Sequence, residues 1–235
     1  MHTDRASGEK RGAMDFIFML TRNDETIADC LAVYDAIRAV PVTHIGFKDV
    51  GTDFDTLRRL HDRMKADGRT TYLEVVSTDR ATCLRSAEAG TKLGVDCLMG
   101  GTLVEDVLKI TKGTKTGYYP FPGTPVGHPT KLGGDPAKIA ADTKAMVAAG
   151  CAGVDLLAYR ATEADPLDLI RAARSATTKP VVVAGSIDSP ARIQAVREAG
   201  ADLFTIGTAA LDGSFNPRYG LLANQLELIL KACKA

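Results

Sequence analysis

The chain has 235 residues, of which 45% are hydrophobic and 25% are charged, as is usual for a globular protein. Its 29 Lys and Arg residues balance 29 Asp and Glu residues, so no surplus of positive charge indicates a nucleic acid or an anionic membrane as a partner. The five cysteines have no CxxC spacing, which excludes the usual pattern of a zinc site and fits a reducing cytoplasm.

The first 13 residues are polar, of mixed charge, and lack the apolar stretch of a secretory signal. We predict a flexible extension over residues 1–13 and one domain over residues 14–235. Eight short apolar runs follow in this domain, as expected for buried strands. These predicted strands are Phe16–Leu20, His44–Phe47, Thr71–Val76, Asp96–Met99, Gly117–Tyr119, Val154–Ala158, Val181–Ala184 and Leu203–Ile206.

Amphipathic segments alternate with the strands, and this order predicts a parallel sheet covered by helices. Eight strands favour a single (β/α)8 TIM barrel. An open doubly wound sheet is the alternative, but its glycine-rich phosphate loop follows the first strand, and Thr21-Arg22-Asn23-Asp24 contains no glycine. The predicted helices are Thr26–Val40, Phe54–Asp67, Arg80–Leu93, Val104–Thr111, Pro136–Ala149, Pro166–Ala176, Ser189–Ala199 and Gly220–Ala232.

Two consecutive strands near the C-terminus end in glycine. The seventh is followed by Gly185 and Ser186, and the eighth by Gly207 and Thr208. Glycine lets backbone N–H groups approach an anion without a side chain in the way. In barrels, the loops after strands seven and eight are where phosphate often binds. These four residues therefore predict a phosphate site.

The two turns resemble those of the ribulose-phosphate-binding barrels. This superfamily includes the histidine- and tryptophan-pathway barrels, ribulose-phosphate epimerase, and the hexulose- and ketogulonate-phosphate decarboxylases. The close match covers about the last quarter of the chain. The resemblance implies a phosphorylated ligand. The decarboxylases also carry an Asp-x-Lys-x-x-Asp motif on the third strand, from which Tyr72-Leu73-Glu74-Val75-Val76-Ser77 departs, so their reaction does not transfer to this chain.

Lys48 and Glu74 are the predicted catalytic pair. The period of two along their strands places both side chains toward the barrel axis, at the carboxyl ends where barrel enzymes have their active sites. Lysine can stabilise an enolate while glutamate moves a proton. A buried ion pair that only closes the core is the alternative. In a third interpretation, Lys48 is the Schiff-base nucleophile of an aldolase.

Four further residues are candidates on the loops of the same face. Arg22 and Arg160 are placed to bind an anion, Tyr159 adds a hydroxyl, and His128 is a candidate acid or base. A solvent-exposed loop position is the alternative for Arg22 and His128, and helix capping and surface charge are the alternative for Tyr159 and Arg160. His128 lies in the longest of these loops, residues 120–134, whose proline and glycine content is typical of an ordered lid.

Asp155 belongs to a repeated Gly-x-Asp pattern that also contains Asp96 and Asp202. Each copy follows a helix and enters a strand, and strand beginnings lie at the stability end of a barrel. We therefore interpret Asp155 as structural. We expect no metal site, because the four histidines are scattered. We also expect no cofactor, although magnesium held by Glu74 and Asp49 stays open.

Together these features predict an enzyme acting on a small phosphorylated sugar or keto-acid by proton transfer next to a carbonyl, as an isomerase, an epimerase or a lyase. A phosphate-binding barrel without catalysis is the alternative from another class. The expected partner is a small phosphorylated metabolite, not a nucleic acid or a membrane. Self-association into a homo-oligomer stays open.

Overall fold

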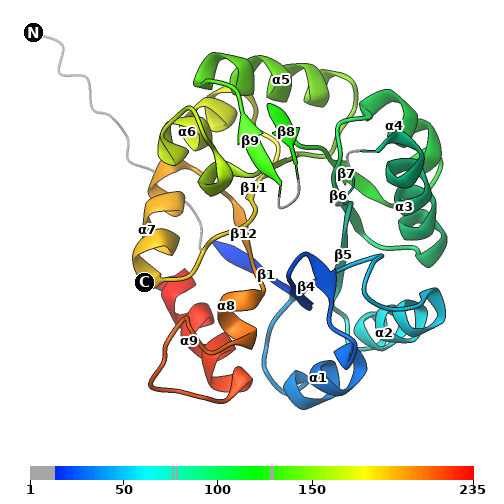
Figure 1. The fold of residues 1–235 in the computed structure, drawn as a ribbon, viewed down its shortest axis with the longest axis vertical. Coiled ribbons are helices and arrows are strands. Elements are labelled where there is room, and N and C mark those ends of the chain that lie inside the picture. The colour runs from blue at the N-terminus through cyan, green and yellow to red at the C-terminus, as the bar shows by residue number, and fades with distance from the viewer. Residues whose placement is uncertain (1–13, 76, 78, 128–129) are drawn as a thin grey trace, which may run out of the picture.

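Parallel strands surround the centre of the molecule (Figure 1). The structure is a computed structural model that describes residues 14–75, 77, 79–127 and 130–235. Within these residues, one eight-stranded sheet runs in the order β10-β11-β12-β1-β4-β5-β6-β7. Its strands are β1 Asp15–Met19, β4 His44–Lys48, β5 Thr70–Val75, β6 Cys97–Gly100, β7 Gly117–Tyr119, β10 Val154–Leu156, β11 Val181–Val183 and β12 Leu203–Ile206.

Two backbone hydrogen bonds connect the two edge strands of this sheet. The N–H of Ala152 donates to the carbonyl of Tyr118 at 2.9 Å, and the N–H of Asp155 donates to the carbonyl of Pro120 at 3.0 Å. The sheet is therefore nearly closed into a barrel. The predicted (β/α)8 TIM barrel is confirmed.

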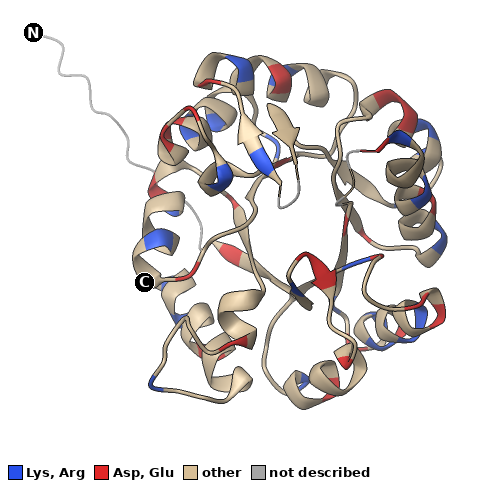
Figure 2. Cartoon of the chain, viewed as in Figure 1, with Lys and Arg blue, Asp and Glu red and all other residues tan. Residues whose placement is uncertain are grey.

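Helices surround the barrel, and most begin at a polar cap. Asp53, Asp79, Asp135, Asp165 and Ser189 each accept a hydrogen bond from a backbone N–H in the first turn of the following helix. In Figure 2, the positions of Lys and Arg alternate with those of Asp and Glu along these helices. The helices are α1 Cys30–Ile37, α2 Phe54–Ala66, α3 Arg80–Leu93, α4 Val104–Thr111, α5 Pro136–Ala148, α6 Pro166–Ala176, α7 Pro190–Ala199, α8 Thr208–Leu211 and α9 Leu222–Lys234, with a 3-10 turn η1 at Ala158–Arg160. None of the described helices is long and apolar enough to cross a membrane.

Two predicted elements differ from the structure near the barrel mouth. The first predicted helix starts at Cys30 instead of Thr26, because β2 (Thr21–Arg22) and β3 (Glu25–Thr26) form a small antiparallel hairpin. The strand predicted over Val154–Ala158 ends at Leu156, because the chain turns into η1. A second hairpin, β8 (Thr124–Val126) with β9 (Lys131–Gly133), occupies the long loop after β7.

Side chains alternate between two apolar regions, as the period of two requires. Outward residues such as Phe16, Phe18 and Phe47 pack against the helices in the larger cluster. A smaller cluster fills the barrel interior and contains Ile17, Met19, Tyr72, Cys97, Met99 and Val182. The described chain has five free cysteines, all buried. Residues 1–13, Val76 and His128 lie outside the described residues.

Candidate functional site

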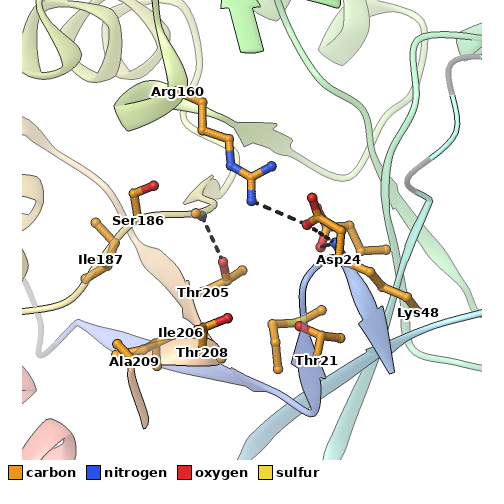
Figure 3. A pocket seen from close by; sticks show the side chains of 14 residues that line it. Thr21, Asp24, Lys48, Arg160, Ser186, Ile187, Thr205, Ile206, Thr208 and Ala209 are labelled. Carbon is orange, nitrogen blue, oxygen red and sulfur yellow. Dashed lines mark hydrogen bonds and ion pairs between the residues drawn. The ribbon is translucent and has the colours of Figure 1, made fainter. Parts of the chain in front are cut away.

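A polar pocket opens at the carboxyl ends of the strands, with an empty volume of about 520 Å³ that includes its open mouth (Figure 3). It lies above the apolar barrel interior and is bordered by β1, β4, β5, η1 and the turns after β11 and β12. Its walls include most of the predicted site residues and several others. The lining residues are Met19, Thr21, Asp24, Lys48, Glu74, Arg160, Gly185, Ser186, Ile187, Thr205, Ile206, Gly207, Thr208 and Ala209.

Lys48 is the centre of an ion-pair network. It lies opposite Glu74 in the register of β4 and β5, and its Nζ is 3.3 Å from Glu74 Oε2. The same Nζ donates to Asp24 Oδ1 at 2.8 Å. Burial lowers the pKa of Lys48, but the charges of Glu74 and Asp24 outweigh burial and raise that pKa above its ordinary value. Lys48 is therefore an ammonium ion at neutral pH.

Asp24 comes from the tip of the β2–β3 hairpin, and the sequence analysis missed it. Asn23 and Asp24 both have positive φ, 52° and 63°, as the central residues of the tightest hairpin turns do. Thr26 holds this hairpin against β4, because its Oγ1 donates to the carbonyl of Lys48 at 2.7 Å. The Asn-Asp pair, which tolerates positive φ, was the available sequence signal.

Arg160 reaches the pocket from η1 and is the second cation that contacts Asp24, with its Nη2 3.4 Å from Asp24 Oδ1 (Figure 3). Burial raises the pKa of the Asp24 carboxyl, but the charges of Lys48 and Arg160 lower it more, and the net pKa is below its ordinary value. Asp24 is therefore an anion shared by two cations.

The turn after β11 is shaped by Gly185 and Ser186, whose φ values are 81° and 61°. A Cβ on Gly185 would lie 2.7 Å from Nε of Arg160, so only glycine lets the guanidinium rest against this turn. The N–H of Gly185 donates to Thr205 Oγ1 at 3.1 Å. This hydrogen bond links the turn to β12.

The turn after β12 depends on a second close approach. A Cβ on Gly207 would lie 2.9 Å from the carbonyl oxygen of Thr21 and 3.0 Å from that of Met19. Helix α8 then begins at Thr208, and the N–H groups of Ala210 and Leu211 donate to the carbonyl of Gly207. The first N–H groups of a helix have no partner within it. Those of Thr208 and Ala209 are thus available at the pocket wall.

Two predicted residues, Arg22 and Tyr159, do not line this pocket, and a third is not described. Arg22 pairs with Asp212 at 2.6 Å, with both side chains more than 40% exposed. Tyr159 lies under the guanidinium of Arg192 and lines a neighbouring groove that also contains Lys131. His128 falls outside the described residues.

The acidic residues near the pocket do not form a metal cluster. Asp49 accepts a hydrogen bond from Ser86 Oγ on α3 at 2.5 Å and does not line the pocket with Glu74. In the part of the chain that the structure describes, no group of three or more His, Cys, Asp or Glu side chains is arranged to hold a metal ion.

Asp155 differs from the two aspartates with which the sequence grouped it. Asp96 accepts hydrogen bonds from the N–H and Oγ1 of Thr71, and Asp202 accepts one from the N–H of Val181. Asp155 is fully buried inside β10, and neither of its carboxyl oxygens has a hydrogen-bond partner. The prediction that Asp155 shares their structural position is therefore wrong.

Comparison with known proteins gives a family match that includes both glycine turns. Residues 106–216, which include both turns and Arg160, match the family model described as histidine biosynthesis protein. A structure described as native KDPGal is 14% identical with a TM-score of 0.65, and the alignment covers 95% of each chain. The family match agrees with the resemblance seen in the sequence of the two turns, and the structural similarity shows the same barrel fold.

Two further solved structures have the same fold. A 3-hexulose-6-phosphate synthase is 19% identical with a TM-score of 0.61, over 93% of this chain and 99% of that one. Orotidine 5′-phosphate decarboxylase from Lactobacillus acidophilus is 13% identical with a TM-score of 0.64, over 94% and 100%. No curated protein matches the chain. The family match begins after β4 and β5, so it does not include Lys48 and Glu74.

Proposed function

We propose that this barrel is an enzyme that acts on a small phosphorylated sugar or keto-acid by proton transfer next to a carbonyl. One observation carries the proposal: the two glycine turns and the Lys48–Glu74 pair line the same pocket. A ligand whose phosphate binds at the turns would extend its other end toward the ion-pair network.

The phosphate end is supported by the groups that the turns present. Arg160, Ser186, Thr208 and Ala209 all line the pocket, and they carry a guanidinium, two hydroxyls and the first N–H groups of α8. Backbone N–H groups and arginine are the usual partners of phosphate oxygens. The printed names of the hexulose-6-phosphate synthase and the orotidine 5′-phosphate decarboxylase each contain a phosphate, which supports the same ligand class.

The reacting end is supported by the state of Lys48. An ammonium has three N–H donors, and Asp24 and Glu74 occupy two of them. The third donor can polarise a carbonyl oxygen, while Glu74 accepts the proton of the neighbouring carbon. A Schiff-base nucleophile needs a lysine with a lowered pKa, whereas that of Lys48 is raised. The environment thus favours Lys48 as electrophile over Lys48 as nucleophile.

Binding is tested with pairs of ligands that differ only in the phosphate. We expect sugar and keto-acid phosphates, but not their dephosphorylated forms, to raise the melting temperature. Arg160→Gln should weaken this stabilisation. Arg171→Gln, which removes an exposed arginine on α6, is the matched control and should leave it unchanged. Equal stabilisation by both forms of each pair would contradict phosphate recognition.

Catalysis is tested by turnover of the ligands that bind. Lys48→Ala and Glu74→Gln should each abolish it, whereas Glu198→Gln, an identical change at an exposed site on α7, should not. Retained turnover in both variants would remove the mechanism. Binding without turnover in the unaltered protein would favour the non-catalytic barrel, and a borohydride-trapped adduct on Lys48 would favour the aldolase.

A further inference from the structure

Asp155 is a buried acid that the mechanism above does not use. It pairs in register with Val182, whose side chain belongs to the cluster inside the barrel, so the Asp155 carboxyl also points inward. Its exposed fraction is 0%, and no donor lies within hydrogen-bonding distance of either carboxyl oxygen in the part of the chain that is described. A buried carboxyl group with no partner destabilises a protein, which suggests that it has a role other than stability.

The other two aspartates of the Gly-x-Asp pattern show what a structural role looks like. Asp96 also pairs with Lys65 at 2.8 Å, and Asp202 pairs with Arg174 at 2.7 Å. Each therefore joins neighbouring elements through several hydrogen bonds. Asp155 makes none of these contacts from its side chain. Asp96 and Asp202 can therefore serve as control positions when Asp155 is substituted.

The charged groups around Asp155 belong to the pocket. Burial is the main cause that raises its pKa well above the ordinary value, and the negative charge of Glu74 raises it further. Lys48 and Arg160 oppose this effect without cancelling it. Tyr118 on β7 is also close enough to interact with Asp155, and burial raises the pKa of its phenol. Glu74 faces the barrel interior as Asp155 does, because it pairs in register with Met99 of the inner cluster.

We propose that the Asp155 carboxyl keeps its proton in the resting protein, and that Asp155 is a positioning residue for proton transfer by Glu74. This role rests on the proposed function. Glu74 accepts a proton from the ligand carbon, and the electron pair of that C–H bond moves to the carbonyl oxygen, forming an enediolate. Glu74 exchanges this proton with solvent through the open mouth of the pocket. It then protonates the former carbonyl carbon, while the hydroxyl proton of the first carbon moves to the former carbonyl oxygen. A neutral Asp155 keeps a second negative charge away from the enediolate.

The resting proton is tested without any substrate. Infrared spectra at neutral pH should contain the carbonyl stretch of a protonated carboxyl group that is absent from Asp155→Asn. In Glu74→Gln this band should titrate at a pH lower by about one unit or more, because the neighbouring charge is gone. Absence of the band in the unaltered protein would overturn the protonated Asp155, and an unchanged titration in Glu74→Gln would overturn its coupling to Glu74.

Stability separates Asp155 from its structural counterparts. A raised pKa in the folded state means that the unaltered protein loses stability as the pH rises from about 4 toward that pKa. Asp155→Asn lacks this loss, so at neutral pH it should melt at a higher temperature than the unaltered protein. Asp96→Asn and Asp202→Asn should melt at lower temperatures. A lower melting temperature of Asp155→Asn would make Asp155 a structural residue.

The pH profile of turnover tests the positioning role. Ionisation of Asp155 at high pH would place a second charge near the enediolate, so the rate should fall there. Asp155→Asn should keep binding the same ligands and lose this alkaline limb. An unchanged limb would overturn the role. If no phosphorylated ligand binds at all, the proposed function fails, whereas the infrared experiment still decides where the proton lies.

Discussion

Lys48 provides the most quantitative stability prediction. Lys48→Met keeps an unbranched side chain but removes the ammonium from between Asp24 and Glu74. Lys48 is 3% exposed, and the side chains of both carboxylates are 11% exposed, so water cannot replace the lost charge. Removing one partner of a buried ion pair costs about 3–5 kcal/mol. For a protein of this size, the melting temperature should fall by roughly 6–20 °C.

The assay is urea denaturation at pH 7, followed by circular dichroism. Lys138→Met is the matched control, because Lys138 is an exposed lysine that pairs with Asp142 one helical turn away. Its loss should cost less than about 1 kcal/mol. The variant that combines Lys48→Met with Asp24→Asn and Glu74→Gln should regain much of the stability, since neither carboxylate is left without its ammonium. Arg160 loses Asp24 in this variant, but its side chain is 26% exposed to solvent.

The pH dependence of this effect has a definite sign. Lys48 and Arg160 lower the pKa of Asp24 in the folded state, so the stability from Asp24 is present above its ordinary pKa and is lost as the pH falls through the lowered one. The deficit of Lys48→Met should therefore shrink below about pH 4. A deficit below about 1 kcal/mol at pH 7, or one that grows on acidification, would refute the reasoning.

Three other changes have clear expected outcomes. Gly207→Ala should lower the melting temperature, since its Cβ would meet two carbonyl oxygens at 3.0 Å or less, whereas Gly220→Ala has nothing within 4 Å and should not. Gly185→Ala should displace Arg160 and weaken the thermal stabilisation by phosphate esters; unchanged stabilisation would contradict this contact. The pKa of Asp67 is lowered to about 2, mainly by its hydrogen bond from Arg38. Asp67→Asn should thus be less stable than the unaltered protein at pH 7 in acid-denaturation curves, with the difference vanishing as the pH falls toward 2.

Periodicity explains why much of the site could be predicted. The alternation of apolar and polar residues along β4 and β5 placed Lys48 and Glu74 on the inner side, where the structure has them. The glycines after β11 and β12 likewise indicated where other groups contact the backbone closely: Arg160 at Gly185, and two carbonyl oxygens at Gly207. Both inferences use local patterns that the barrel preserves.

Asp24 and Asp155 show where local patterns were insufficient. Asp24 enters the pocket because a four-residue hairpin folds back over β4, and its partners Lys48 and Arg160 are distant in the sequence. Asp155 shares a tripeptide pattern with Asp96 and Asp202, but it pairs with Val182, which pairs with Leu203, so Asp155 lies one residue further along the sheet than Asp202. A shift of one residue along a strand moves a side chain to the other face. The sequence pattern does not contain this register.

Solvent exchange tests the central claim most directly. The unaltered protein is incubated in deuterium oxide with phosphorylated sugars and keto-acids that stabilise it, and the recovered ligand is analysed by mass spectrometry. We predict deuterium on the carbon next to the carbonyl with the unaltered protein, and none with Glu74→Gln although that variant still binds the ligand. Equal exchange in both, or no exchange of any bound ligand, would contradict proton transfer by Glu74.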